Sequence, residues 1–267
     1  MTTYLDRILA AHRAAAEVDG RDLAPLVVEA RAQAPARGFT AALRTAPGVG
    51  VVAEVKRRSP SKGDLAAGLD PATLAGAYER GGAHCLSVLT DREFFGGSPE
   101  DLRAARAATG LPVLRKDFTV APADVCDARI MGADAVLLIA AALDDDELAE
   151  LHTLALDVGL DALVEVHDEQ ELERALAAGA GLVGVNQRDL VTFEVDHERA
   201  ERVGRAMPDT VVRVAESGIR GPDDARRLAD AGFDAVLVGE SLVTAPDPAA
   251  AVAALRDSGA GRGPAHR

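Results

Sequence analysis

A carboxylate and an amine lie two positions apart at the end of an apolar run, in the segment AEVK. The run covers residues 51–56, and the alternation of side chains along a strand places Glu54 and Lys56 on the same face. Charged groups in a buried strand are costly unless they are paired or functional. The two residues therefore form either a structural ion pair or part of a site for acid–base chemistry.

Lysine is unusually rare in this chain. Of its 29 basic residues only Lys56, Lys62 and Lys116 are lysines, and the rest are arginines. Arginine stays protonated, whereas a buried lysine can shift its pKa and exchange a proton. Because Lys56 and Lys116 both fall at the ends of apolar runs, these two positions are candidates for proton transfer. Lys62 falls in a following loop and is interpreted as a loop cation rather than a catalytic residue.

Polar residues also follow most of the other apolar runs. Only the run over 135–140 ends without one. A core needed for stability alone has no use for polar groups at one end of nearly every strand, which favours an active site there. The residues are Thr90, Asp91, Lys116, Asp117, Glu165, His167, Asn186, Arg188, Glu216, Ser217, Glu240 and Ser241.

The elements that must position these side chains are eight predicted strands separated by helical segments. Alternating strands and helices of this length are typical of an α/β fold, a single (β/α)8 TIM barrel, whose active sites lie at the carboxyl ends of the strands. A doubly wound open sheet usually has fewer strands and a Gly-rich turn after the first, which is missing here. The strands are predicted at residues 51–56, 85–90, 112–118, 135–140, 162–166, 182–186, 211–217 and 235–239.

The chain divides into three predicted parts. Residues 1–47 precede the first strand and form a helical extension that packs on the barrel or covers one mouth. Residues 48–256 form the barrel. The Gly-rich residues 257–267 are predicted to be a disordered tail.

The loops after the last two strands are the usual phosphate site of this fold. The segments ESG and VGES place small residues where backbone N–H groups can reach an anion, at Gly218, Gly239 and Glu240. Ser59 in the loop after the first strand is positioned to close the same site. The glycines alone are also explained by tight turns.

Composition narrows the classes of partner. The net charge of −14 argues against nucleic acid and anionic membranes, and no apolar run is long enough to span a membrane. Cys85 and Cys126 show no metal-ligand spacing, and the first 20 residues lack the apolar stretch of a signal peptide. We expect a cytoplasmic protein, a monomer or weak homodimer, that binds a small phosphorylated molecule and no metal.

Eight stretches together resemble the indole-3-glycerol-phosphate synthase family of tryptophan biosynthesis over roughly residues 50–245. The resemblance implies a cofactor-free enzyme that closes 1-(2-carboxyphenylamino)-1-deoxyribulose 5-phosphate to an indole with loss of carbon dioxide and water. The matching stretches are AEVKRRSPSKG, SVLTDREFFGGS, PVLRKDF, GADAVLLI, LVEVHDEQEL, GVNQRDL, VAESGI and AVLVGESL.

The resemblance also implies roles for individual residues. Lys116 matches the general acid of ring closure, and Glu216 matches a charged residue that positions a lysine. Glu54, Lys56 and Glu165 match the later acid–base groups, whose division of labour stays open. The remaining matches are Asn186 as a substrate-orienting residue, Phe95 and Phe118 as apolar walls, Arg188 as a nearby cation, and Ser59, Ser217, Gly218, Gly239 and Glu240 as phosphate contacts.

Two departures from the family pattern occur. Gln187 replaces a second Asn, and APAD at residues 121–124 replaces Asp-Pro-Tyr-Gln, which puts local packing or a partner contact in doubt. Three rival interpretations exist. A phosphoribosylanthranilate isomerase-like barrel needs a catalytic Cys, and a tryptophan synthase α-subunit lacks the two lysines. The third is a catalytically inactive phosphate-binding barrel subunit.

Overall fold

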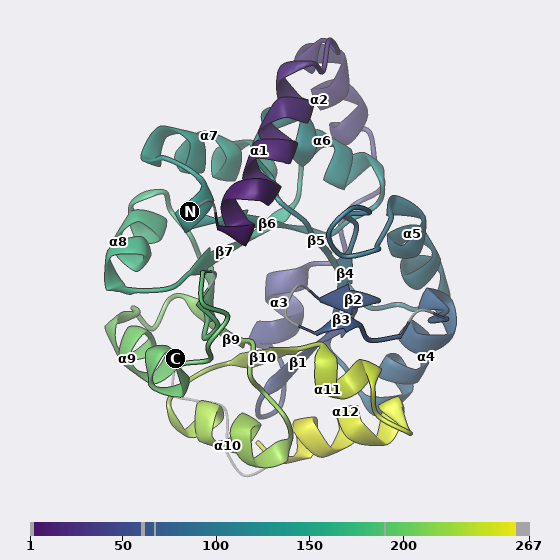
Figure 1. Ribbon diagram of the computed structural model, residues 1–267, viewed down its shortest axis with the longest axis vertical. Coiled ribbons are helices and arrows are strands. Elements are labelled where there is room, and N and C mark those ends of the chain that lie inside the picture. Colours follow the sequence, from purple (N-terminus) through teal and green to yellow (C-terminus); the bar gives the residue numbers. More distant parts are fainter. Residues whose placement is uncertain (1–2, 60–61, 67, 190, 260–267) are drawn as a thin grey trace.

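The computed structural model describes residues 3–59, 62–66, 68–189 and 191–259. Eight parallel strands close into a barrel in the order β1-β10-β9-β8-β7-β6-β5-β4, and helices surround it (Figure 1). The predicted (β/α)8 barrel and its eight strands are confirmed. The strands are β1 (Gly50–Val55), β4 (Cys85–Leu89), β5 (Val113–Lys116), β6 (Ala135–Ile139), β7 (Asp161–Val166), β8 (Leu182–Asn186), β9 (Val212–Glu216) and β10 (Ala235–Val238).

The strands are almost continuously buried, because one face packs inside the barrel and the other against the helices. Their register places the polar residues level with one another at the carboxyl ends. Leu89 of β4 pairs with Lys116 of β5, Ile139 of β6 with Glu165 of β7, and Asn186 of β8 with Glu216 of β9.

The outer helices begin and end as their sequences predict. Asp144 caps its helix by accepting a hydrogen bond from the Glu147 N–H at 2.8 Å. Gly132 after α6 and Gly232 after α10 adopt φ values of 100° and 97°, and each lies in the turn that connects its helix to the next strand. The outer helices are α4 (Pro71–Gly81), α5 (Pro99–Ala108), α6 (Pro122–Ile130), α7 (Asp145–Asp157), α8 (Glu169–Ala177), α9 (His197–Ala206), α10 (Pro222–Asp230) and α12 (Pro248–Asp257).

Three shorter elements lie in the loops at the strand ends. A two-stranded antiparallel ribbon, β2 (Arg58–Ser59) and β3 (Gly63–Asp64), follows β1 and was not predicted from the sequence. The 3-10 helix η1 (Ala140–Ala142) follows β6, and the short helix α11 (Glu240–Val243) follows β10.

The segment before β1 contains three helices, α1 (Tyr4–Glu17), α2 (Leu23–Arg31) and α3 (Phe39–Arg44). Helices α1 and α2 lie beside α6 and α7, where Arg21 pairs with Asp127 at 2.8 Å (Figure 1). Helix α3 lies at the opposite end of the barrel, where the Thr40 N–H donates to Asp161 at the start of β7. The segment thus runs along the outside of the barrel from one end to the other.

The predicted disordered tail starts one residue inside α12, since that helix extends to Asp257. Residues 260–267 of that tail lie outside the described part of the chain.

Candidate active site

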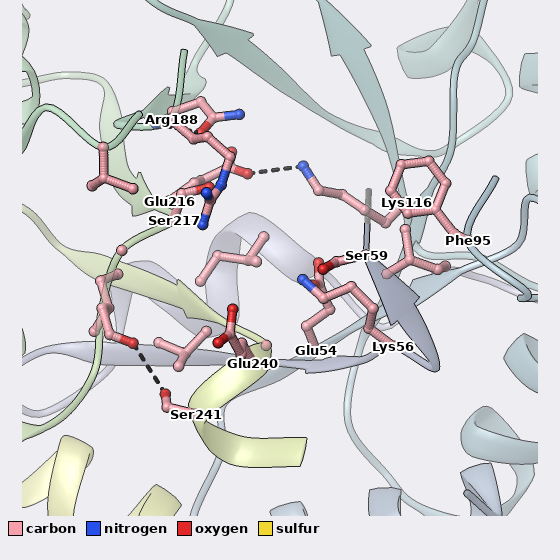
Figure 2. A pocket seen from close by; sticks show the side chains of 18 of the residues that line it. Glu54, Lys56, Ser59, Phe95, Lys116, Arg188, Glu216, Ser217, Glu240 and Ser241 are labelled. Atoms are coloured by element: carbon pink, nitrogen blue, oxygen red, sulfur yellow. Dashed lines mark hydrogen bonds and ion pairs between the residues drawn. The ribbon is translucent and has the colours of Figure 1, made fainter. Parts of the chain in front are cut away.

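A cavity of about 650 Å³ opens at the carboxyl ends of the barrel strands (Figure 2). The residues that the family resemblance assigned to the site all line this cavity, although they come from strands and loops spread over nearly 190 positions of the chain, whereas the strand-end residues Thr90, Asp91 and His167 do not line it. The register of a closed parallel barrel brings them together. They are Glu54, Lys56, Ser59, Phe95, Lys116, Phe118, Glu165, Asn186, Arg188, Glu216, Ser217, Gly218, Gly239 and Glu240.

Lys116 at the end of β5 lies between two carboxylates from other strands. Its Nζ is 2.8 Å from Glu165 Oε2 on β7 and 2.8 Å from Glu216 Oε2 on β9, and Figure 2 shows the second contact. Asn186 on β8 donates its Nδ2–H to the other oxygen of Glu165 at 3.0 Å. Four strands therefore hold one ammonium group and its partners in place.

Burial and charge shift the pKa values of this cluster in different directions. Burial by itself lowers the pKa of Lys116, but the carboxylates of Glu165 and Glu216 outweigh it and raise the pKa. Burial likewise opposes ionisation of Glu165, yet the Lys116 ammonium lowers the pKa of that carboxyl. For Glu216, burial and the nearby Glu165 charge raise the pKa against the opposing effect of Lys116.

The pKa values of Lys116 and Glu165 thus move away from neutral pH, whereas that of Glu216 rises to about 7. The reason is that Lys116 has two carboxylates as partners, which only the folded structure reveals. Lys116 therefore carries its proton at neutral pH.

Glu54 and Lys56 form an ion pair on the opposite side of the cavity. Lys56 Nζ lies 2.7 Å from Glu54 Oε1, and the Ser87 hydroxyl donates to Glu54 Oε2 at 3.3 Å. The Glu54 side chain is 4% exposed and that of Lys56 is 19% exposed. Both side chains line the cavity, and the Lys56 ammonium group is the more exposed of the two.

Gly184 in β8 leaves the space that the Glu216 side chain occupies. A Cβ at this position would lie 2.0 Å from Glu216 Oε1 and 3.3 Å from Leu163 Cδ1. The glycine in the segment LVGVN therefore has a packing reason that its sequence context does not reveal.

One wall of the cavity is apolar. Phe95 and Phe118 lie with ring centroids 6.5 Å apart and an interplanar angle of 30°. Leu137 and Ile139, from the strand that ends without a polar residue, line the same cavity. This wall offers a flat ligand contact area close to Lys116.

The predicted phosphate loops meet at the other side of the cavity. Ser217 and Gly218 both have positive φ, at 66° and 73°. A Cβ on Gly239 would lie 2.4 Å from Glu54 Oε1 and 3.0 Å from Lys56 Nζ, so this glycine also makes room for the ion pair. A substitution of Gly239 would therefore disturb the ion pair together with any anion site.

Two basic residues of the cavity, His197 and Arg220, were not predicted from the sequence. His197 begins α9 and Arg220 follows the ESGI segment, and Arg220 Nη2 lies 3.4 Å from His197 Nε2. Their sequence signal is weak: Arg220 comes shortly after the predicted strand 211–217, and His197 follows the loop after the predicted strand 182–186. Lys62 also lines the cavity, with its Nζ 3.5 Å from Glu240 Oε1.

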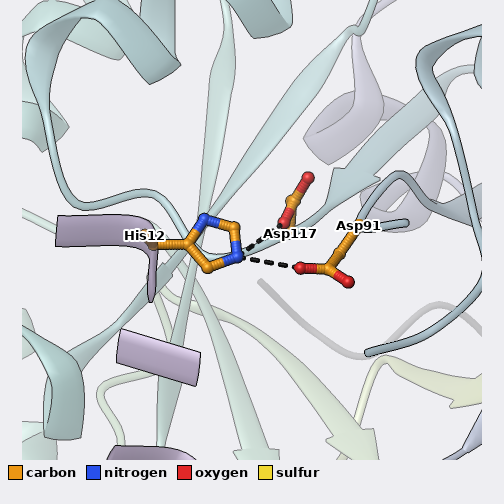
Figure 3. Close-up of side chains that lie close together, drawn as sticks. All are labelled: His12, Asp91 and Asp117. Carbon is orange, nitrogen blue, oxygen red and sulfur yellow. Dashed lines mark hydrogen bonds and ion pairs between the residues drawn. The ribbon is translucent and has the colours of Figure 1, made fainter. Parts of the chain in front are cut away.

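Other strand-end polar residues form a separate cluster that attaches α1 to the mouth (Figure 3). His12 Nε2 lies 2.9 Å from Asp91 Oδ2 and 3.8 Å from Asp117 Oδ1. The three ligand atoms are close enough together to hold a metal ion. Asp117 is, however, already paired with Arg115 at 3.1 Å and accepts a hydrogen bond from Thr90. Arg115 and His12 thus pair with the carboxylates of the cluster. We interpret the cluster as the anchor that attaches α1 to the ends of β4 and β5.

Both departures from the family pattern are accommodated locally. Gln187 donates its Nε2–H to the Ser217 carbonyl at 2.7 Å and so supports the loop after β9. Asp124 accepts hydrogen bonds from the backbone of Val120 and Ala121 at the start of α6. None of residues 121–124 lines the cavity.

The two cysteines do not reach the site. Cys85 opens β4 at the far end of the barrel, Cys126 is buried in α6, and neither lines the cavity. An isomerase that uses a cysteine as its acid or base therefore has no candidate for that role here.

Comparison with known proteins gives a consistent result. The family model described as indole-3-glycerol phosphate synthase matches residues 5–255. Proteins named indole-3-glycerol phosphate synthase from Mycobacterium ulcerans and Mycolicibacterium smegmatis are 51% and 52% identical over 261 residues, which is 96% of this chain and 95% of each relative. A solved structure of thiamine phosphate pyrophosphorylase from Pyrococcus furiosus has a TM-score of 0.60 at 20% identity, covering 81% of this chain and 96% of that one, and shares the fold.

Proposed function

Because this chain belongs to the indole-3-glycerol phosphate synthase family, we propose that it converts 1-(2-carboxyphenylamino)-1-deoxyribulose 5-phosphate into indole-3-glycerol phosphate, carbon dioxide and water. The observation that carries the residue assignments is the position of Lys116. A protonated amine lies between two buried carboxylates, in the same cavity as an apolar wall and the loops after β9 and β10.

Ring closure needs a proton donor at the ribulose carbonyl. The ring carbon that bears the carboxylate attacks the carbonyl carbon, and the carbonyl oxygen takes a proton from Lys116 Nζ as the new C–C bond forms. Lys116 is then a neutral amine. The carboxylate leaves as carbon dioxide, and its bonding electrons restore the aromatic ring.

The second half of the reaction removes water. The hydroxyl formed in ring closure leaves with a proton from an acid, and the adjacent carbon loses a proton to a base. The proposal assigns these roles to Glu54, Lys56 and Glu165, three further ionisable groups that line the cavity. Asn186 orients Glu165 and the substrate, while Glu216 positions Lys116.

The substrate's two ends fit the two sides of the cavity. The anthranilate ring would lie against Phe95 and Phe118, and the phosphate would be bound by Ser59, Arg188, Ser217 and the backbone N–H groups of Gly218, Gly239 and Glu240. Figure 2 shows Lys116 between the Phe95 side and the Ser217 side.

Turnover by the purified protein tests the proposal. The chain has no Trp, so the fluorescence of the indole product would be measured over a low background. We expect stoichiometric formation of indole product and carbon dioxide without an added cofactor. Binding of the substrate without any product would instead identify an inactive phosphate-binding barrel.

We also propose that the protein acts in the cytoplasm as a monomer or weak homodimer. Both cysteines are free and buried, which suits a reducing compartment. Among the described residues no helix is long and apolar enough to cross a membrane. In the same part of the chain, the large exposed hydrophobic side chains are few: Val18, Leu23, Val28, Leu156 and Val191.

A further inference from the structure

His167 directly follows β7 and faces the Glu165 carboxylate from outside the cavity. Its Nε2 lies 3.6 Å from Glu165 Oε1, and its Nδ1 lies 3.0 Å from Glu171 Oε2 on α8. The imidazole does not line the cavity and so does not reach a bound substrate. Any effect on the reaction must act through Glu165.

The hydrogen bond to Glu171 determines which protons the imidazole carries. An ionised carboxylate only accepts hydrogen bonds, so Nδ1 must carry a proton. In a neutral imidazole Nε2 would then present a bare lone pair to the Glu165 oxygen. Nε2 is buried and has no hydrogen-bond partner among the described residues, so the Glu165 oxygen at 3.6 Å is its polar neighbour. Two buried acceptors facing each other repel, whereas a proton on Nε2 converts the contact into an ion pair.

We propose that His167 is a positioning residue for the reaction: protonated between Glu165 and Glu171, it keeps the Glu165 carboxylate ionised after Lys116 has given up its proton. This inference rests on the proposed function, because it needs Lys116 as the acid of ring closure. Glu165 has Lys116 as its other cation, at 2.8 Å. When Lys116 becomes a neutral amine, His167 is the positive charge that remains in contact with Glu165.

The surroundings of His167 agree with this state. Burial lowers the pKa of His167, but the hydrogen bond to Glu171 and the charges of Glu165 and Glu171 outweigh it, so the net shift is upward. Arg199 on α9 is the nearby cation that opposes the shift. The protonated form is therefore present below the folded pKa and is lost as the pH rises through it.

Two variants test the inference. His167→Asn removes the charge, and Glu171→Gln keeps an acceptor for Nδ1 while removing the charge that favours the imidazolium. An opposite charge within about 4–6 Å lowers a carboxyl pKa by about 1–3 units. We therefore expect kcat of His167→Asn to fall by about tenfold or more, since each pKa unit is a tenfold change in the ionisation equilibrium. KM should not change, because His167 lies outside the cavity.

The pH dependence distinguishes this role from a purely structural one. Wild-type kcat should decline as the pH rises through the pKa of His167, which NMR of the imidazole measures. Glu171→Gln should move both the pKa of His167 and the midpoint of the decline in kcat to lower pH. Glu169→Gln is the matched control, because Glu169 is on the same helix and pairs with Arg202 at 3.0 Å on the surface. It should leave both unchanged.

Each outcome is decisive. A wild-type protein that forms no indole product contradicts the proposed function itself. A wild-type protein that turns over, with His167→Asn or Glu171→Gln giving the same kcat and the same pH profile, overturns the role of His167 alone. If His167→Asn does not fold, the shift or constancy of the profile in Glu171→Gln decides the question.

Discussion

At the scale of single residues, the two lysines of the cavity differ in their partners. Lys116 is shared by two carboxylates, whereas Lys56 pairs with Glu54 alone among the residues that the structure describes. A lysine held by two acids stays protonated and fixed in position. This arrangement suits a proton donor, and it means that removal of either lysine leaves buried carboxylates without their cation.

Replacement of Lys116 should abolish most of the chemical step. Positioned acid–base groups contribute about 10² to 10⁴ in rate, so Lys116→Ala should lower the single-turnover rate by about that factor. Lys116→Arg should not restore it, because a guanidinium donates protons poorly near neutral pH. Single-turnover kinetics measure this directly. A Lys116→Arg variant with nearly wild-type turnover would contradict the assignment of Lys116 as the acid.

The Glu54–Lys56 pair can be tested by replacing both members. Glu54→Gln/Lys56→Met removes both charges together, so the variant should stay folded and at least as stable, yet turn over far more slowly. Lys56→Met alone should lower both the melting temperature and the rate, because it leaves the buried Glu54 without its partner. Thermal melts beside single-turnover kinetics measure the two effects. Wild-type kinetics in a folded double variant would show that the pair is structural.

At the scale of secondary structure elements, β8 and α1 have positions that support the site indirectly. Gly184 of β8 leaves room for Glu216, which in turn contacts Lys116. Helix α1 is attached to the ends of β4 and β5 through His12, and the His12 ring lies 5.6 Å from that of Phe118. The position of the apolar wall thus depends on an element that contributes no proposed acid or base.

A methyl group at position 184 should displace Glu216 and misplace Lys116. Gly184→Ala places a Cβ 2.0 Å from the present position of Glu216 Oε1. A displacement of about 1 Å can cost about 10² in rate, so kcat should fall by about that factor. Gly181→Ala, in the turn before the same strand, meets nothing within 4 Å and is the control. Equal steady-state rates for the two variants would show that Glu216 does not position Lys116.

The attachment of α1 should weaken as the pH rises. Burial lowers the pKa of His12, but the hydrogen bond that its Nε2–H donates to Asp91 and the charges of Asp117 and Asp91 outweigh this effect and raise the pKa above 6.5. A raised pKa in the folded state means that this stabilisation is fully present below about 6.5 and is lost as the pH rises through the folded pKa. The protection of the α1 amides against hydrogen exchange, which is the intrinsic exchange rate divided by the observed rate, should therefore fall as the pH rises through the pKa of His12.

His12→Gln should remove that pH dependence, and Arg31→Gln, which breaks an exposed ion pair of α2 with Asp157, should retain it. Protection of α1 that does not change with pH in the wild-type protein would exclude His12 as the titrating anchor.

At the scale of the whole molecule, the cavity is formed by residues from many strands and loops of the closed barrel. Residues from β1, β5, β7, β8 and β9 and from the loops after β9 and β10 surround one cavity. A ligand that contacts several of these elements binds the folded barrel and not the unfolded chain. Ligand binding should therefore stabilise the whole molecule against unfolding.

Inorganic phosphate should raise the melting temperature more than chloride at the same ionic strength. A ligand at 100 times its Kd adds about 2.7 kcal/mol to the free energy of unfolding. Scanning calorimetry over a series of phosphate concentrations measures the effect, with chloride as the control for screening. Identical melting temperatures in the two salts would argue against an anion site in the loops after β9 and β10.

The fold, and the set of strand-end residues that line the cavity, could be predicted from the order and spacing of the residues. Eight short apolar runs with helical segments between them predicted a parallel barrel, and such a barrel brings the carboxyl ends of all its strands to one mouth. Residues such as Glu54, Lys116 and Glu165 could therefore be assigned to one cavity from their positions at strand ends alone.

The tertiary structure decided which of these residues touch one another. Lys116 has two carboxylate partners, Gly184 makes space for one of them, and His12 reaches Asp91 across 79 positions of the chain. These contacts depend on the stagger of the strands and on how α1 packs against the mouth, which local sequence patterns do not encode. For the same reason the direction of the Lys116 pKa shift became clear only in the folded barrel, since it depends on charges contributed by strands far apart in the sequence.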